Sequence, residues 1–371
     1  MRRSPTPGIH DPQNRIATQT TTRIATRIAT RFATRSTSRK RRGDTTAVRH
    51  RFARLLGAAI VASTIAAPLA ADAATPTGTI ASQVPPAIAA SLAKIGRVVA
   101  PPPTAALYAP LQQREPYPDV SVTRSIAYGD DPRHLLDVFE PATRQAARPV
   151  LVFVHGGAFT RGDRRTGDSP FYDNVMLWAV ANGMVGVNMT YRLAPAHRWP
   201  AAQEDIARAV GWIRGRIGAH GGDPTRVVLM GHSAGAAHVA QYVGHSRFHT
   251  VAGSGLAGAV MVSGLYDPTT AEANPPLRAY FGEDPSAYAA RSALPGMRAS
   301  ALPMLLAYAE LDPDDFHRQA EQARTALCDA GRCRPTLKLL GHSHMSELYA
   351  INTEDRAFTD ALKAFVADLP R

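Results

Sequence analysis

Short, uninterrupted apolar runs alternate with helical patterns from about residue 120 to the C terminus, and this alternation restricts the possible folds more than any other feature of the chain. Such a run is typical of a strand that is buried on both faces, as in a parallel sheet. The segments between the runs place apolar residues at helical spacing, which predicts helices that cover both faces. The pattern predicts one α/β domain over residues 120–371 with a mostly parallel, doubly wound sheet.

The expected strands are 120–128, 135–139, 150–154, 184–189, 227–230, 259–262, 304–307 and 336–340. The expected helices are 87–96, 201–217, 316–329, 354–367 and one that begins at Ala234. Three consecutive prolines at 101–103 are expected to end the first helix. A polar, proline-rich insertion at 265–300 is expected to form a small cap. Aromatic residues of this insertion and its surroundings either cap a pocket or pack in the core, and these are Tyr266, Tyr280, Phe281, Phe159 and Trp199.

The formal charge of +12 is confined to the N-terminal part of the sequence. Residues 1–54 hold 14 Lys or Arg and two acidic residues, and the remainder holds 28 of each sign. The globular part therefore has no net basic excess with which to hold nucleic acid. Residues 1–47 repeat the tetrapeptide Arg-Ile-Ala-Thr, and we expect a low-complexity arm that is disordered or not translated.

Residues 48–73 have the organisation of a secretory signal peptide. Three arginines precede an uncharged run over 55–71, and Ala71-Asp72-Ala73 fits the small-x-small cleavage pattern. The run is shorter than the ~20 residues of a spanning helix, which argues against a stable membrane anchor. We expect translation to start at Val48 and export to the periplasm or beyond, with cleavage near Ala73. Residues 74–119 then form a Pro/Ala-rich segment with a short helix at the start of the mature protein.

A candidate nucleophile lies at the junction of an expected strand and an expected helix. Gly231-His232-Ser233-Ala234-Gly235 directly follows the 227–230 strand. In that position the glycines permit the tight turn that exposes a serine hydroxyl above the edge of a sheet. The N terminus of the following helix would add free N–H groups and a positive dipole. Ser233 is therefore the expected nucleophile.

A second glycine-containing turn follows the 150–154 strand, with the sequence His155-Gly156-Gly157-Ala158-Phe159. Glycines allow backbone N–H donors to approach a substrate carbonyl closely. The N–H groups of Gly156 and Gly157, with that of Ala234, are the predicted oxyanion hole. His155 precedes the nucleophile, whereas hydrolases of this plan place their catalytic histidine last, so we expect a structural role for it.

A serine needs a base to accept its proton and an acid to orient that base. The loop after the 304–307 strand offers Asp312 as the expected acid, with Glu310, Asp314, Asp315 and Asp267 as alternatives.

Two histidines in the loop after the 336–340 strand are candidates for the base. His344 is the expected base because it lies far enough into the loop to reach Ser233, and His342 is expected to cap or pack that loop. Neither histidine is accompanied by a third ligand at metal-binding spacing, so no metal is expected.

These motifs together resemble the α/β-hydrolase serine carboxylesterases with an HGG oxyanion motif, near the hormone-sensitive-lipase-like and kynurenine-formamidase-like branches. The resemblance runs from about residue 120 to the C terminus, and the chain order Ser233, Asp312, His344 agrees with it. Three further segments carry it: 191–195 (YRLAP), 200–202 with Asp205, and 222–224 (GDP). Phe159 replaces the usual Trp of the formamidase-like members, and Ala158 replaces the third Gly of the lipase-like members. The branch and the substrate therefore stay open.

The resemblance implies a serine esterase that acts on a small-molecule ester through an acyl-enzyme and needs no cofactor, and the signal peptide predicts that it is exported. Amide hydrolysis of the arylformamidase kind, with the same residues, is the alternative. A non-enzymatic adhesion-type hydrolase fold is disfavoured because the triad is complete. A nucleic-acid-binding role is supported only by the N-terminal arm.

Cys328 and Cys333 are the two cysteines of the sequence, which excludes a scaffold of several disulfides and a four-cysteine zinc site. They flank Gly331, which can adopt the positive φ of a turn after a helix end. Export would place the pair in an oxidising compartment, so we expect a disulfide between them.

Overall fold

The computed structural model describes residues 78–143, 147–333 and 336–370. These residues lie in the second of the two units into which the chain divides, Met1–Ala67 and Pro68–Arg371. The N-terminal arm, the start at Val48 and the signal peptide all lie outside the described residues.

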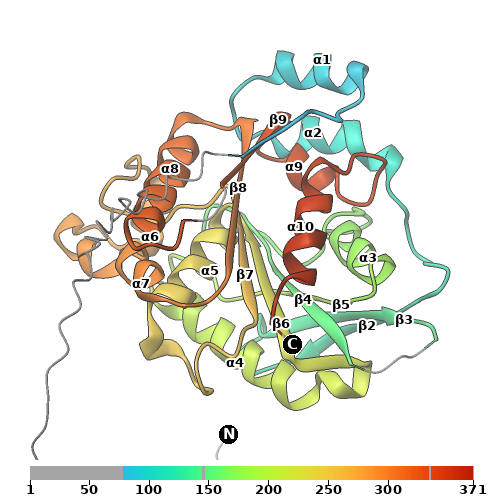
Figure 1. Cartoon of the computed structure of the whole chain (residues 1–371), viewed down its shortest axis with the longest axis horizontal. Coiled ribbons are helices and arrows are strands. Elements are labelled where there is room, and N and C mark those ends of the chain that lie inside the picture. Colours follow the sequence, from blue (N-terminus) through green and yellow to red (C-terminus); the bar gives the residue numbers. More distant parts are fainter. Residues whose placement is uncertain (1–77, 144–146, 334–335, 371) are drawn as a thin grey trace, which may run out of the picture. The chain divides into compact units, whose positions relative to one another are not determined.

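Nine strands of the described residues form one sheet in the order β1-β9-β8-β7-β6-β4-β5-β3-β2 (Figure 1). β3 pairs in antiparallel fashion with β2 and β5, and the other neighbours are parallel. The mostly parallel sheet predicted from the apolar runs is therefore confirmed. The strands are β1 (Gly78–Ile80), β2 (Val120–Ala127), β3 (Leu135–Pro141), β4 (Arg148–Val154), β5 (Val185–Met189), β6 (Gly222–His232), β7 (Gly258–Val262), β8 (Met304–Leu311) and β9 (Thr336–Ser343).

Helices cover both faces of the sheet, as Figure 1 shows for α3 and α10 on one side and α5 on the other. Val152 of β4 points into one core and Leu151 into the other, which is why the strand is apolar at successive positions. The first core holds side chains of α4 (Ala201–Arg216), α5 (Ala234–Gly244), α6 (Pro275–Phe281), α7 (Leu294–Ala299) and α8 (Asp314–Asp329). The second holds side chains of α1 (Pro86–Ile95), α2 (Pro101–Tyr108), α3 (Asp173–Ala181), α9 (Ser346–Tyr349) and α10 (Ala357–Ala367).

Five α-helices of the described residues lie outside the expected set, namely α2, α3, α6, α7 and α9, and the first two have clear physical reasons. The prolines at 101–103 form the first turn of α2, whereas α1 already ends at Ile95. Proline is tolerated there because the N–H groups of a first helical turn have no partner within the helix. α3 was not predicted, since residues 173–180 are all buried and the segment shows no polar stripe by which a helix is recognised.

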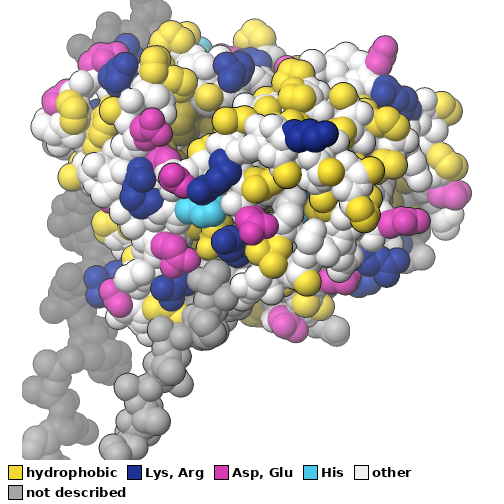
Figure 2. Space-filling model, turned by 90° about the horizontal axis from the view of Figure 1, so that it is seen from above, with side chains coloured by type: hydrophobic (Ala, Val, Ile, Leu, Met, Phe, Trp, Pro, Cys, Tyr) yellow, Lys and Arg dark blue, Asp and Glu magenta, His cyan; other side chains and the backbone are white. Residues whose placement is uncertain are grey.

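The segment before residue 120 joins the same sheet. β1 pairs in parallel with β9, so that Gly78 lies opposite Leu337. On the face seen in Figure 2, side chains of both charge signs mix with apolar ones over the described residues. No helix of the described residues combines the length and the apolar character that a membrane crossing requires.

The insertion at 265–300 forms α6, α7 and two single 3₁₀ turns. Its aromatic side chains Tyr266, Tyr280 and Phe281 are fully buried in the core. Phe159 stacks on Tyr280 with ring centres 4.9 Å apart, so the insertion packs directly behind the Phe159 side chain.

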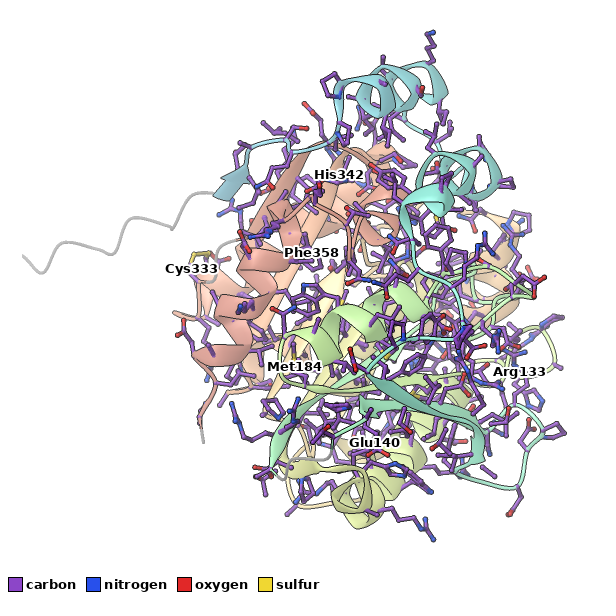
Figure 3. The ribbon with its side chains drawn as sticks, turned by 90° about the vertical axis from the view of Figure 1, so that its right-hand side faces the viewer. Arg133, Glu140, Met184, Cys333, His342 and Phe358 are labelled. Atoms are coloured by element: carbon purple, nitrogen blue, oxygen red, sulfur yellow. A yellow bond between two sulfur atoms is a disulfide. The ribbon has the colours of Figure 1, made fainter. Side chains whose placement is uncertain are left out.

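A disulfide joins Cys328, in the last turn of α8, to Cys333 (Figure 3). Gly331 between them has a φ of 69°, the positive value that the turn requires.

Candidate active site

Two neighbouring parallel strands bring the two glycine-containing motifs to one edge of the sheet. Val154 of β4 pairs with Gly231 of β6, so the chain leaves both strands at the same level. A Cβ atom added to Gly156 would lie only 3.0 Å from the Cβ of Ser233. Ligands of open α/β sheets bind beyond the carboxyl ends of the strands, and this edge is such a place.

Ser233 lies between β6 and α5 with φ 56° and ψ −124°, a conformation that L-residues rarely adopt. Its N–H donates to the carbonyl of Val262 at 2.9 Å, and its own carbonyl accepts from the N–H of Ala237 at 3.0 Å. The main chain on both sides of the turn is therefore held. Gly235 permits the turn to pack against β4, because a Cβ there would lie 2.1 Å from the carbonyl oxygen of Val154.

Replacing Gly235 with Ala is expected to lower the free energy of unfolding by about 3 kcal/mol, the upper end for an overpacked core. The added methyl group would overlap backbone atoms that cannot move aside. Thermal unfolding of the variant measures the effect. Gly211 on α4 is the matched control, since a Cβ there meets nothing within 4 Å. Gly211→Ala is expected to raise stability by up to ~1 kcal/mol. Equal effects of the two variants would contradict the packing argument.

A second pair of parallel strands, β8 and β9, brings the expected acid and base together. Leu311 of β8 pairs with Ser343 of β9, and Asp312 and His344 are the residues that follow them. His344 Nδ1 lies 2.7 Å from Asp312 Oδ1, and both side chains are fully buried. The second oxygen of Asp312 accepts the Ser263 hydroxyl at 2.6 Å and the N–H of Ala309 at 2.9 Å. Asp312 is thus held on both sides as an acceptor that orients His344.

The alternative carboxylates have other partners. Glu310 accepts the N–H of Gly341 at 2.8 Å, and Asp267 caps its own loop by accepting from Thr269. The side chain of Asp314 is 83% exposed and pairs with Arg97, and that of Asp315 pairs with Arg318.

His342 lies apart from this pair and forms a second buried set of contacts. Its Nε2 is 3.2 Å from Asp355 Oδ2, and its Nδ1 is 3.2 Å from the hydroxyl of Ser346. β9 extends to Ser343, so His342 belongs to the strand and not to the expected loop, and its contacts pack the end of that strand.

A cavity of about 540 Å³ collects the expected nucleophile, base and oxyanion donors. Ser233, His344, Gly156, Gly157 and Ala234 all line it. His344 Nε2 has no hydrogen-bond partner among the described residues, which leaves it able to accept a proton. Apolar side chains form much of the remaining wall, namely Phe159, Leu265, Phe316, Met345 and Tyr349.

The oxyanion motif is held by contacts of its first histidine. His155 Nδ1 lies 2.7 Å from the carbonyl of Gly156, and its Nε2 lies 3.2 Å from the hydroxyl of Thr190. Burial lowers the pKa of His155 to about 4, so the ring stays neutral near pH 7. Both nitrogens are engaged in structure, in agreement with the structural role expected for this residue. Gly157 has φ 130° and no space for a side chain, because a Cβ would lie 2.0 Å from the carbonyl of Arg161.

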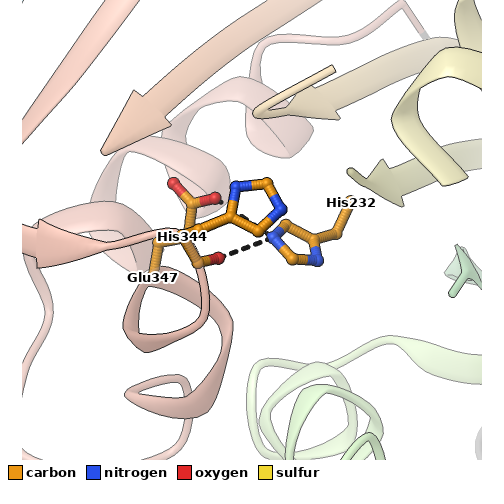
Figure 4. A group of neighbouring side chains, drawn as sticks. All are labelled: His232, His344 and Glu347. Atoms are coloured by element: carbon orange, nitrogen blue, oxygen red, sulfur yellow. Dashed lines mark hydrogen bonds and ion pairs between the residues drawn. The ribbon is translucent and has the colours of Figure 1, made fainter. Parts of the chain in front are cut away.

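Sequence reasoning missed three polar residues beside Asp312 and His344. Ser263 follows β7 directly, as Ser233 follows β6, and this position at the carboxyl edge is the signal that could have found it. His232 and Glu347 flank candidates that had already been chosen, and their roles depend on contacts between distant segments. Figure 4 shows them with His344.

His232, His344 and Glu347 place donor atoms within 4.8 Å of one another, and these residue types suit a metal ion such as Zn²⁺. Protein hydrogen bonds already use two of the ring nitrogens, however. His232 Nε2 lies 2.8 Å from the carbonyl oxygen of His344, and His344 Nδ1 is bound to Asp312. His232 Nδ1, His344 Nε2 and both oxygens of Glu347 have no hydrogen-bond partner among the described residues, so each residue keeps an atom that could serve as a ligand.

Burial determines the charge states in this cluster. Desolvation, and then the negative charge of Asp312, raise the pKa of Glu347 well above its usual range, with Ser263 acting in the opposite direction. Desolvation, and then the neighbouring His344, lower the pKa of His232 well below its usual range. Glu347 and His232 are thus a neutral pair, even though Glu347 Oε1 lies 3.2 Å from His232 Nε2.

Replacing Glu347 with Gln is expected to give a stability advantage that grows with pH. The raised pKa means that folding favours the protonated carboxyl. Its stabilising contribution is complete below the unfolded value of 4.5 and is lost as the pH rises toward the folded value. Gln does not titrate, so the Tm difference between Glu347→Gln and the parent protein should increase from about pH 4 to about pH 8. Thermal melts across that range test this, and a difference that stays constant or shrinks would show that Glu347 is ionised in the folded protein.

Known proteins resemble this chain in sequence and in fold. The family BD-FAE matches residues 136–258, about a third of the chain. Over 264 residues the chain is 28% identical to the esterase LipQ of Mycobacterium tuberculosis. This alignment covers 66% of this chain and 62% of LipQ. An alignment of 139 positions with the para-nitrobenzyl esterase of Bacillus subtilis is 35% identical, and it covers 33% of this chain and 28% of that esterase. The chain thus spans less than two thirds of the length of these relatives.

Among solved structures, esterase B of Lactobacillus rhamnosus superimposes with a TM-score of 0.59 at 20% identity, over 76% of this chain and 93% of that protein. The described protein has the α/β-hydrolase fold. An arylesterase structure matches as well, with a TM-score of 0.55 at 21% identity over 71% of this chain and 88% of that one. The resemblance stated from the sequence motifs is confirmed at the level of the fold.

Proposed function

We propose that this α/β-hydrolase is a serine carboxylesterase with Ser233, His344 and Asp312 as its triad. The observation that carries the proposal is the 2.7 Å contact between His344 Nδ1 and Asp312, with the other ring nitrogen unpartnered in the cavity that Ser233 also lines. A histidine held in this way keeps its hydrogen on Nδ1 and presents Nε2 as a base.

The reaction begins when the Ser233 hydroxyl attacks the ester carbonyl and His344 Nε2 takes its proton. Asp312 stabilises the imidazolium that forms. The N–H groups of Gly156, Gly157 and Ala234 bind the oxyanion of the tetrahedral intermediate, as the HGG motif of the esterase branches implies. His344 then returns the proton to the departing alcohol, and water hydrolyses the acyl-enzyme by the same steps in reverse order.

The ester, and not an amide, is the proposed substrate because the similar proteins LipQ and para-nitrobenzyl esterase are named as esterases. The apolar wall with Phe159, Leu265 and Phe316 suits an acyl chain or an aromatic alcohol. Arylformamidase-like amide hydrolysis, with the same residues, is the alternative, and Phe159 in place of Trp leaves the branch open.

A hydrolysis screen of residues 74–371 tests the proposal. p-Nitrophenyl esters of graded acyl length are compared with phenyl acetate and with N-formyl aniline, which offers the same ring on an amide. We expect turnover of the esters and little of the anilide. Hydrolysis of the anilide alone would favour the amide reading, and hydrolysis of neither would overturn the proposal.

The proposal includes export, with a signal peptide over 48–73. The features that support it are the arginine-flanked apolar run of the sequence and the Cys328–Cys333 disulfide, a bond that persists in oxidising compartments. N-terminal mass spectrometry of the native protein tests it, with a start near Ala74 as the expected result. Peptides from residues 15–45, or two free thiols per unfolded, unreduced chain, would contradict it.

A further inference from the structure

A second histidine–carboxyl pair lies directly beside the catalytic one. His232 is the last residue of β6, next to the nucleophile, and Glu347 lies on α9 three residues after His344. Each is only 1% exposed. Glu347 Oε1 lies 3.2 Å from His232 Nε2, and Figure 4 shows both side chains beside His344. The reaction described above gives neither residue a part.

His232 holds the main chain of the catalytic histidine. Its Nε2 lies 2.8 Å from the carbonyl oxygen of His344, and the two ring centres are 4.7 Å apart. A carbonyl oxygen only accepts hydrogen bonds, so the hydrogen of the neutral His232 ring is on Nε2. The carbonyl belongs to a fully buried residue and needs a donor, and His232 supplies it.

The contacts of the His344 ring do not by themselves fix its place relative to Ser233. Asp312 holds one nitrogen, and Phe316 packs against the ring with centres 4.4 Å apart. Both residues belong to the β8–α8 region and not to the strand that carries the nucleophile. His232 belongs to that strand, so its hydrogen bond links the base directly to the neighbour of Ser233.

We propose that His232 and Glu347 form a positioning pair for His344, an inference that rests on the esterase function proposed above. His232 sets the carbonyl of His344 at a fixed place relative to Ser233. Glu347 Oε1 lies 3.2 Å from the same nitrogen without a hydrogen bond to it, so its side chain packs against the donor from α9. A base must lie within hydrogen-bond reach of the proton that it takes, and a misplacement of ~1 Å can cost ~10² in rate.

Two substitutions of His232 separate positioning from packing. The amide nitrogen of Gln reaches about as far as His Nε2 and can donate to the His344 carbonyl, whereas that of Asn is too short. We expect His232→Asn to lower kcat at least about tenfold with little change in KM, because the base is displaced while the apolar wall of the cavity stays. His232→Gln should recover most of that loss.

His342, in β9 two residues before His344, provides a matched control, because it is an equally buried histidine with a carboxylate 3.2 Å from its Nε2. His342→Asn should lower Tm while kcat stays within about twofold of the parent value, since that ring has no contact with the catalytic pair. Equal kcat losses in His232→Asn and His342→Asn, or no recovery in His232→Gln, would overturn the proposal.

Glu347 gives an independent pair of variants that decides the question if His232→Asn does not fold. Glu347→Ala should lower kcat at unchanged KM, and the isosteric Glu347→Gln should recover most of the loss. Equal kcat values in the two variants would remove Glu347 from the pair. The esterase function is judged separately, from ester hydrolysis by the parent protein. An inactive parent protein would count against the proposed function. An active parent whose His232 variants keep the parent kcat would count against the positioning pair alone.

Discussion

Replacing Ser233 with Ala is expected to lower kcat for ester hydrolysis by ~10⁴-fold or more, the size typical of triad knockouts. The substitution removes the nucleophilic oxygen and nothing else. The oxyanion donors and the cavity remain, so substrate binding should persist. Initial rates with the best p-nitrophenyl ester of the acyl series measure the effect.

The fold should survive this change because Ala fits wherever Ser does and the hydrogen bonds of Ser233 to Val262 and Ala237 are made by its main chain. A thermal melt of Ser233→Ala is the control. A folded variant that retains more than about a hundredth of the parent rate would show that another residue is the nucleophile.

Replacing His344 with Ala is expected to be comparably damaging, while His342→Ala should leave most of the activity. His344 has an unpartnered Nε2 in the cavity and Asp312 behind it, whereas both ring nitrogens of His342 face Asp355 and Ser346. Removing the base should lower kcat ~10⁴-fold, and removing His342 should mainly lower Tm. Rates and melts of the two variants are measured side by side.

The order of the two histidines is the decisive result. A larger loss of kcat in His342→Ala than in His344→Ala would contradict the assignment of the base and, with it, the role of Asp312. Loss of activity together with loss of folding in His344→Ala would be resolved by His344→Gln, which fills the same space without a basic nitrogen.

The strands of the sheet could be predicted because burial on both faces makes their sequences apolar at every position. Val150–Val154 is the clearest case, with every side chain fully buried in one core or the other. The elements that were missed lack such a signal. α3 is buried on nearly all sides and therefore has no polar stripe, and the short β1 is a strand only because β9 lies beside it.

The residue types of the site could be predicted from the sequence, but the contacts that each of these residues makes could not. Ser233 and the glycines of the oxyanion motif follow from turns that only glycine permits, so local sequence carries that information. Ser263, His232 and Glu347 act through contacts with segments far away in the chain, such as the 2.8 Å hydrogen bond from His232 to the carbonyl of His344. No spacing in the sequence indicates a contact of that kind.

The sequence by itself determined most strands of the α/β domain, the glycine-containing turn that holds Ser233, and the set of carboxylates and histidines from which the proposed acid and base come. Backbone conformation and apolar burial depend on local residue types, and these can be read along the chain. Only the tertiary structure decided which carboxylate meets which histidine, because that depends on the register of β8 against β9. With Leu311 opposite Ser343, Asp312 faces His344 while Glu310 accepts from Gly341. A register shifted by one residue would turn each side chain to the other face of the sheet, and no short motif encodes it.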